Sequence, residues 1–342
     1  MLIINLEYLV APLLCGGKCI NDFAEDLSII HRISQHPEVS IFKEEDIILK
    51  LTEANYFPSD VAFNSVLPHD IELVYSVNDI VKLINKVIGS AVENNISFLT
   101  HELEWGKQSV EPHIEFLNKK REEYYHELFK ITLLNGFLSK DTSHILSFQK
   151  GFAFKSNVKY KIGTSLLDAY PEDLFELPHE FNEEIFLYSD IKTIINDINC
   201  LELYQSSRND DQLKLSLYLG AIKFAYSNNI DGYISWDDFD IGESFFESLV
   251  KNQCAYEQNF SSTLYNILIK IICRRSEDLA VNKFFKSDDA NEQRVYRGLG
   301  AYRCHITKHH EGLRLMFWVE PSTKRIILAN VGPKMELMIS KP

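Results

Sequence analysis

Residues 300–342 constrain the fold of this chain more than any other segment, because they contain three consecutive runs with the character of β-strands. The side chains of a strand point alternately to its two faces, so residues two apart share a face. The first run has apolar residues on one face and basic or hydroxyl residues on the other: Tyr302, Cys304 and Ile306 against Arg303, His305 and Thr307. We therefore expect a strand that packs on one side and presents positive charge on the other.

The second and third runs extend this pattern into an antiparallel meander. A tight connection ends at Gly312, and the run that follows again divides into two faces: Leu313, Leu315, Phe317 and Val319 against Arg314, Met316 and Trp318. Residues 320–324 have the composition of a turn. Residues 326–331 are almost continuously apolar, which is typical of a strand buried on both faces, and Gly332 ends that run.

This segment resembles the RelE/ParE-like toxin fold, and within it the RelE-type ribosome-dependent mRNA endonucleases. Three short stretches carry the resemblance: Tyr302-Arg303-x-His305-Ile306, Gly312-Leu313-Arg314-Leu315-Met316-Phe317 and Val331-Gly332-x-Lys334. The likeness extends over residues 230–342 and is close only in the last part. It implies a helical hairpin ahead of an antiparallel sheet, which agrees with the helical patterns at residues 241–253 and 260–275.

The resemblance also implies RNA cleavage without a metal or another cofactor. In that chemistry the ribose 2′-OH attacks the adjacent phosphate, so the protein must transfer protons and stabilise charge on the phosphoryl oxygens. Arg314 matches the family's central arginine, which implies phosphate stabilisation. Arg303 and His305 match basic positions on the preceding strand, and an unperturbed pKa of about 6.5 suits His305 to act as base or acid. Lys334 matches the basic residue after Val-Gly, with a point charge in place of a bidentate fork.

The expected partner is RNA, including RNA held on the ribosome. Further contacts to RNA are expected from basic residues in the two connections of the meander: Lys308, His309, His310, Lys324 and Arg325. Arg303 and His309 also have the R-x5-H spacing of a helical type of ribonuclease motif, although the strand pattern gives them a different context. Both readings indicate a ribonuclease.

One departure from the family pattern leaves a noncatalytic alternative open. The nuclease members usually carry a tyrosine near the C-terminal end, and residues 335–340 contain none. ParE-type members keep the fold, lack the nuclease residues and act on a protein target, so the fold alone does not establish an enzyme. A solvated basic face of a sheet would also account for Arg303, His305 and Arg314.

The charge of the chain is unevenly distributed. Residues 271–342 contain 13 Lys/Arg and 8 Asp/Glu, a net charge of +5, whereas residues 1–270 contain 22 Lys/Arg and 41 Asp/Glu, a net charge of −19. An acidic body joined to a basic end has two interpretations: the acidic part covers or mimics the polyanion site of the basic part, or it serves solubility.

The six cysteines are scattered, apart from Cys15 and Cys19, which is typical of reduced thiols in an intracellular protein. Residues 1–10 are apolar but lack a basic leader region and contain Glu7, so we expect a buried strand there and no signal peptide. No apolar run reaches the length of a membrane span. We therefore expect a cytoplasmic protein that does not enter the membrane.

The remaining sequence predicts an α+β protein whose N-terminal part is mixed and rich in helices. Amphipathic patterns predict helices at residues 21–33, 43–56, 76–92, 111–134, 189–199 and 211–227, and alternating patterns predict strands within 143–165. A turn cluster at 228–232 is the expected boundary. We thus expect an N-terminal regulatory or sensor domain at 1–229, with room for two subdomains, and a RelE/ParE-like toxin domain at 230–342.

Other constellations carry weaker signals. The spacing of Cys15 and Cys19 is not CxxC and no second pair accompanies it, so we expect no metal site there. Asp173 followed by Asp190-Ile191-Lys192 fits a metal-dependent nuclease pattern, but Ser189 is better interpreted as a helix N-cap. The aromatic residues Trp236, Phe239, Phe245 and Phe246 are expected in the core.

Together these patterns favour a toxin-like RNA endonuclease under the control of a fused N-terminal domain, as in a toxin–antitoxin or antiphage defence effector. Stand-alone toxins of the family are much shorter, so fusion to a large acidic body implies built-in control by a protein inhibitor or partner region. The alternative from another class is a noncatalytic RelE/ParE-fold protein that binds a protein or nucleic acid. A metal-dependent nuclease in the N-terminal part is a third alternative.

Overall fold

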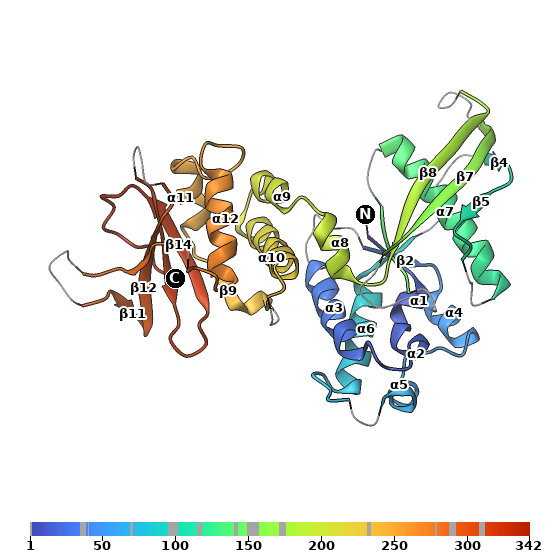
Figure 1. The fold of residues 1–342 in the computed structure, drawn as a ribbon, viewed down its shortest axis with the longest axis horizontal. Coiled ribbons are helices and arrows are strands. Elements are labelled where there is room, and N and C mark those ends of the chain that lie inside the picture. The colour runs from blue at the N-terminus through green and yellow to red at the C-terminus, as the bar shows by residue number, and fades with distance from the viewer. Residues whose placement is uncertain are drawn as a thin grey trace. The chain divides into compact units, whose positions relative to one another are not determined.

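The structure, a computed structural model, is an α+β chain that divides into two compact units, Met1–Ile194 and Ile195–Pro342 (Figure 1). The division falls well ahead of the turn at 228–232, so the helices before that turn belong with the C-terminal sheet. The structure describes residues 2–34, 39, 41–68, 71–94, 102–114, 118–139, 143–148, 157–170, 176–230, 234–277, 279–286, 292–307 and 312–342.

The N-terminal unit is built on a mixed sheet with the strand order β3-β2-β1-β6-β8-β7-β4, and β5 pairs with β7. The first five of these strands are parallel to one another, whereas β7 is antiparallel to β8, β4 and β5. The strands are β1 (Leu2–Ile4), β2 (Ile41–Glu44), β3 (Val92–Asn94), β4 (Glu102–Trp105), β5 (Ser109–Glu111), β6 (His144–Leu146), β7 (Asn157–Tyr170) and β8 (His179–Tyr188).

Helices connect the parallel strands of this sheet. Their bounds are α1 (Leu6–Leu9), α2 (Ala11–Leu14), α3 (Ile20–Ile33), α4 (Ile47–Glu53), α5 (Asp60–Val66), α6 (Val77–Ser90) and α7 (Lys119–Ser139). A further helix, α8 (Ile191–Asp197), follows β8, and its residues fall on both sides of the division between the units. The amphipathic pattern is confirmed for α3 and α6, which pack against each other. The Ser76 hydroxyl accepts a hydrogen bond from the backbone N–H of Asp79 and so caps the start of α6.

Several predicted boundaries in this unit are wrong. The predicted helix at 43–56 begins as strand β2, because pairing with β1 overrides local propensity. Within residues 1–10 only β1 is extended, and α1 follows it. The helix expected from residue 111 begins at Lys119, because the segment before Pro112 pairs with β7 as β5. The expected strands within 143–165 correspond to β6 and to part of β7.

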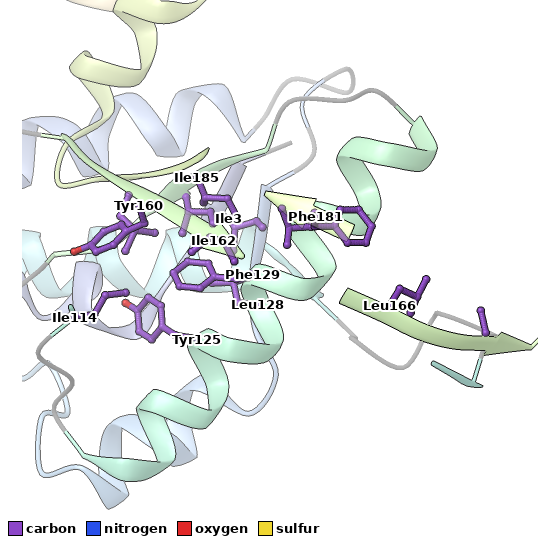
Figure 2. Packing of buried hydrophobic residues seen from close by; sticks show 14 residues of the cluster. Ile3, Ile114, Tyr125, Leu128, Phe129, Tyr160, Ile162, Leu166, Phe181 and Ile185 are labelled. Carbon is purple, nitrogen blue, oxygen red and sulfur yellow. The ribbon is translucent and has the colours of Figure 1, made fainter. Parts of the chain in front are cut away.

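The core of the N-terminal unit lies between α7 and the sheet. Figure 2 shows Tyr125, Leu128 and Phe129 of α7 pointing toward strand residues that include Ile3 and Ile162, and all five side chains are at most 1 % exposed. One face of a long helix therefore covers the middle of a mixed sheet.

The C-terminal unit has a second sheet, with the order β10-β12-β13-β14-β9 and with β11 paired to β12 (Figure 1). Its strands are β9 (Phe239–Ile241), β10 (Val281–Lys283), β11 (Val295–Tyr296), β12 (Leu299–His305), β13 (Arg314–Val319) and β14 (Ile326–Gly332). The antiparallel meander is confirmed in β12, β13 and β14. The burial expected for residues 326–331 is confirmed as well, and the short strand β9 adds to β14 in parallel.

Four helices in the described part of this unit accompany the sheet: α9 (Cys200–Ser206), α10 (Asp210–Ser227), α11 (Phe245–Lys251) and α12 (Ser261–Ile272). The predicted helices at 241–253 and 260–275 are confirmed as α11 and α12. Helix α11 packs on β14, while α10 packs on α9 and α12. Phe239 and Phe245 are fully buried, as expected, whereas Trp236 and Phe246 are partly buried. No helix in the described residues is both long and apolar enough to cross a bilayer.

Candidate functional site

The register of the C-terminal sheet brings the predicted basic residues onto one face. His305 on β12 lies directly opposite Arg314 on β13, and Arg303 lies opposite Met316, the next residue on the same face. Directly opposed residues of an antiparallel pair have Cβ atoms about 5 Å apart, and diagonal neighbours are about 7–8 Å apart. Arg303, His305 and Arg314 are therefore within reach of one another, as their alternation in the sequence predicted.

The segment after β14 adds Lys334 to this group. The Arg314 Nη1 donates a hydrogen bond to the carbonyl oxygen of Lys334 at 3.0 Å. Gly312 contributes to the close approach, because its φ is +60° and a Cβ at that position would lie 3.4 Å from the Lys334 Cβ. We name Arg303, His305, Arg314 and Lys334 the basic cluster. Its four members come from two neighbouring strands and from the segment that follows the third.

Apolar packing supports the basic cluster from one side. The Arg303 guanidinium carbon lies 5.2 Å from the centre of the Phe284 ring, a cation–π contact. On the same face Ala301, Met316 and Trp318 are buried in a cluster with Phe284 and Ala329. This face of the sheet therefore has two parts. Arg303, His305 and Arg314 form a polar part, and Ala301, Met316 and Trp318 belong to a small buried core. The sequence pattern showed the alternation but not the residues that cover Met316 and Trp318.

The C-terminal tail, residues 333–342, covers that middle part. The Trp318 indole N–H donates to the carbonyl oxygen of Ser340 at 2.8 Å. Asn330 binds the tail twice, because its amide donates to the Met338 carbonyl at 3.3 Å and its oxygen accepts the Ser340 N–H at 2.9 Å. The tail also brings Glu336 beside Gly332, so one carboxylate lies near the basic cluster.

The structure does not bring all of the predicted RNA-binding residues to this site. Lys324 and Arg325 lie in the turn between β13 and β14, at the other end of β13 from Arg314, which is about 17 Å away for a strand of this length. Arg325 is paired with Asp240, which also accepts a salt bridge from Lys214 at 2.6 Å. Lys308, His309 and His310 lie outside the described residues.

The opposite face of the meander faces the protein interior. Leu315 and Cys304 are at most 1 % exposed, and the Tyr302 and Phe317 rings stack with their centres 5.8 Å apart. Burial raises the pKa of the Cys304 thiol to about 11, so this cysteine is a packing residue. The two faces predicted from the alternation of residues 302–306 and 313–319 are thus confirmed.

A second polar cluster, which the sequence did not predict, lies at the carboxyl ends of strands β1 and β2. The Arg121 guanidinium, from the first turn of α7, binds both oxygens of Glu7 at 2.7 Å and both oxygens of Glu44 at 2.6 and 2.7 Å. Tyr125 donates to Glu7 at 3.1 Å and is also hydrogen-bonded to Ser147, the residue after β6. Burial alone would lower the pKa of Arg121, but the two carboxylates raise it.

This second cluster has the character of a structural ion pair. Both carboxylates bind one guanidinium, and the Lys50 ammonium lies 3.9 Å from Glu44, so two positive charges accompany the two negative ones. The partners lie 77 and 114 residues from Arg121 in the sequence, and no local spacing could reveal them. Within the described residues, no three His, Cys, Asp or Glu side chains converge as a metal site would require.

The pattern around Asp190 also has a structural explanation in the described residues. The Asp190 carboxylate accepts hydrogen bonds from the backbone N–H and the hydroxyl of Thr193, so Asp190, and not Ser189, caps α8. Lys192 forms a salt bridge with Glu25. Asp173, the other member of the pattern, lies outside the described residues.

Comparisons with known proteins add no relative: no protein-family model, no curated protein and no solved structure matches this chain.

Proposed function

We propose that the C-terminal unit is a metal-independent endoribonuclease of the RelE type. The basic cluster carries this proposal: Arg303, His305, Arg314 and Lys334 gather at one end of the meander, where they can contact a single phosphodiester and its ribose. Two helices, α11 and α12, precede the meander in the chain, as the family resemblance implies, although α12 packs on α10 and α11 packs on β14. Both observations are independent of the catalytic assignment.

The proposed chemistry follows from the residue types in the basic cluster. Arg303 and Arg314 offer planar, permanently charged groups that can bind two phosphoryl oxygens at once and stabilise the charge that develops on them. His305 takes the proton of the 2′-OH or supplies one to the leaving 5′-oxygen, because imidazole exchanges protons near neutral pH. Lys334 is exposed and adds a mobile positive charge for the next phosphate along the strand.

The test compares full-length wild type with Arg303→Ala/Arg314→Ala in cells, following growth and mRNA integrity in the same cultures. The matched control is Lys251→Ala, which removes an exposed cation from α11, the helix that packs on β14. We expect wild type and the control to arrest growth and fragment mRNA, more strongly as the fragment 195–342, which lacks the proposed inhibitory unit, than as the full chain. The double variant should do neither in either form. Attack by a 2′-oxygen leaves a 2′,3′-cyclic phosphate and a 5′-OH, so the chemistry of the RNA ends should be read as well.

Two results would contradict this function. Fragments that carry 3′-OH ends and disappear with chelator would indicate metal-dependent hydrolysis. The second result is intact RNA in cells that contain soluble protein, both for the full chain and for the fragment 195–342. Since the fragment lacks the N-terminal unit, inhibition by that unit could not explain the result, and the endonuclease would be excluded.

An interaction protein is the second candidate, and the C-terminal tail favours it. Met335, Leu337 and Met338 are 84 %, 56 % and 70 % exposed, directly beside the basic cluster. Apolar side chains next to positive charge suit the binding of an acidic protein. The tail also occupies the place where the nuclease members carry a tyrosine. In this case Arg314→Ala would weaken binding of the partner, and no RNA cleavage would be seen at any stage.

The fused N-terminal unit is proposed to control the C-terminal one, in a toxin–antitoxin or antiphage system that acts in the cytoplasm, where mRNA is present. The charge of the N-terminal unit supports this control, because residues 1–194 contain 17 Lys/Arg and 30 Asp/Glu, a net charge of −13, and can compete with RNA for a basic surface. If electrostatic attraction provides this control, raising the salt concentration should weaken inhibition by the N-terminal unit. It should weaken the binding of RNA as well.

A further inference from the structure

Two thiols of the N-terminal unit lie against each other. The Cys15 Sγ and the Cys19 Sγ are 2.7 Å apart, although both cysteines are free. A disulfide bond is about 2.05 Å long, so these sulfur atoms are separated by only about 0.7 Å more than a covalent bond. The spacing of the two residues in the sequence is not that of a familiar dithiol motif, and it is the local fold that brings them together.

The fold of residues 15–19 explains this approach. Cys15 ends α2 and Cys19 precedes α3, and between them Gly16 and Gly17 have φ values of +66° and +76°. These left-handed conformations turn the chain back on itself, which favours glycine at both positions. The loop is also held from outside, because a Cβ at Gly17 would lie 2.6 Å from the carbonyl oxygen of Val66. The Gly17 N–H donates to the Pro12 carbonyl at 2.7 Å.

The two thiols differ in the way that disulfide exchange requires. Cys15 is partly exposed, and a hydrogen bond from the Cys19 thiol lowers its pKa to about 6. Cys19 is 5 % exposed, and its hydrogen bond to Cys15 raises its pKa. The accessible sulfur is thus the thiolate, which is the nucleophile, and the buried sulfur is poised behind it. The other four cysteines are buried, with pKa values that burial raises to about 11 or 12.

We propose that Cys15 and Cys19 form a redox-active dithiol that closes reversibly to a disulfide by exchange with small disulfides such as oxidised glutathione. The Cys15 thiolate attacks one sulfur of the oxidant, whose S–S bond breaks and releases one glutathione thiolate. The Cys19 sulfur then attacks the Cys15 sulfur of this mixed disulfide, and the second glutathione leaves. Two protein sulfurs are oxidised and one small disulfide is reduced. Of the two released glutathione thiolates, one takes the proton of the Cys19 thiol and the other takes a proton from solvent, which replaces the one that Cys15 had already lost.

The proposal is tested on the full chain in glutathione buffers of stepwise increasing oxidised fraction. Each sample is quenched in acid, unfolded and alkylated, and the free thiols are mapped by mass spectrometry. We expect wild type to lose two of its six alkylatable thiols, with Cys15 and Cys19 joined, while Cys200, Cys254, Cys273 and Cys304 stay free. Reduced glutathione should restore all six.

Two variants identify the order of attack. Cys19→Ser should stop at the mixed disulfide and keep one glutathione on Cys15, whereas Cys15→Ser should bind none at Cys19. The proposal is overturned if Cys15 and Cys19 both stay free at the most oxidising ratio. It is also overturned if they are oxidised no faster than Cys304, which serves as an internal control in the same molecule. The wild-type measurement decides the matter alone if a variant fails to fold.

Discussion

Arg121 is the buried cation that binds both Glu7 and Glu44, so its removal leaves two buried carboxylates with only hydrogen bonds and the more distant Lys50 to stabilise them. The side chains of Arg121, Glu7 and Glu44 are at most 7 % exposed. Breaking a buried ion pair by removing one partner costs about 3–5 kcal/mol. We expect Arg121→Ala to lower the free energy of unfolding of the N-terminal unit by about that amount, measured by denaturant unfolding.

Lys120→Ala is the matched control for that change. Its side chain is 86 % exposed and its salt bridge to Glu53 spans 3.8 Å, so we expect a change of at most about 0.5 kcal/mol. A loss below about 1 kcal/mol for Arg121→Ala would show that water reaches the carboxylates and that the cluster is not a sealed ion pair.

Asp26 is the second residue whose environment has a measurable consequence. Burial first, and then the charge of Asp190, raise its pKa well above the ordinary value. Its Oδ2 accepts hydrogen bonds from the Ile191 N–H at 2.9 Å and from the Tyr8 hydroxyl at 3.3 Å, which an asparagine oxygen could also accept. Asn at this position would therefore keep the contacts and remove the charge.

The sign of the pH effect follows from that raised pKa. The folded state holds the Asp26 proton more tightly than the unfolded state, so this group stabilises the fold below the unfolded pKa of about 3.9. That contribution is lost as the pH rises through the higher folded pKa. We expect Asp26→Asn to unfold at a higher temperature than wild type at pH 8, with the difference shrinking toward pH 4. An equal difference at both pH values would contradict the assignment.

At the scale of the elements, α10 and α12 approach each other closely at Gly220. A Cβ on this buried glycine would lie 2.8 Å from the Ile269 Cδ1 and would also contact the Tyr265 hydroxyl. Overpacking of this kind costs about 1–3 kcal/mol. We expect Gly220→Ala to destabilise the C-terminal unit by that amount in denaturant unfolding, in spite of the better helix propensity of alanine.

Gly136 in α7 provides the opposite case. It is exposed, and a Cβ there would have no atom within 4 Å. Since alanine is favoured over glycine in a helix interior by about 0.8–1.0 kcal/mol, we expect Gly136→Ala to stabilise the N-terminal unit slightly. The two substitutions are chemically identical, so opposite signs would show that packing between α10 and α12, and not propensity, determines the first effect.

Elements with a strong local pattern could be predicted from the sequence. Alternation gave the faces of β12 and β13, and amphipathic periodicity gave α3, α6 and α12. Elements that depend on distant partners could not. The local pattern favours helix for part of β2, because the three-residue pairing of β2 with β1 leaves no local signal. No local pattern predicts the long strand β8, although it pairs along much of β7.

The same distinction applies to the candidate site. The cluster of Arg303, His305 and Arg314 could be predicted because the three residues lie on adjacent strands joined by one short connection. The tail that holds Lys334, and the pairing of Arg325 with Asp240, depend on contacts over 20 and 85 residues. The basic residues of the meander therefore looked like one surface in the sequence, and the structure divides them between two ends of the sheet.

At the scale of the whole molecule, the division after Ile194 changes which fragment should fold. Helices α9 and α10 cover α12: Tyr204 packs on Tyr265 with ring centres 5.4 Å apart, and Gln205 donates to the Ser261 hydroxyl at 3.0 Å. A fragment that starts at residue 230 lacks both helices and exposes the apolar surface of α12 that they bury. The turn at 228–232 is a sharp local signal, but it lies inside the compact unit.

We therefore expect the fragment 195–342 to unfold in one cooperative thermal transition, and the fragment 230–342 to aggregate or to melt without one. Circular dichroism and size-exclusion chromatography on the two purified fragments provide the measurement. A cooperative transition in 230–342 would show that the sheet with α11 and α12 is self-sufficient, and that α9 and α10 belong functionally to the N-terminal part. Toxicity tests of inhibition in cis should use 195–342, because an inactive 230–342 would report only a failure to fold.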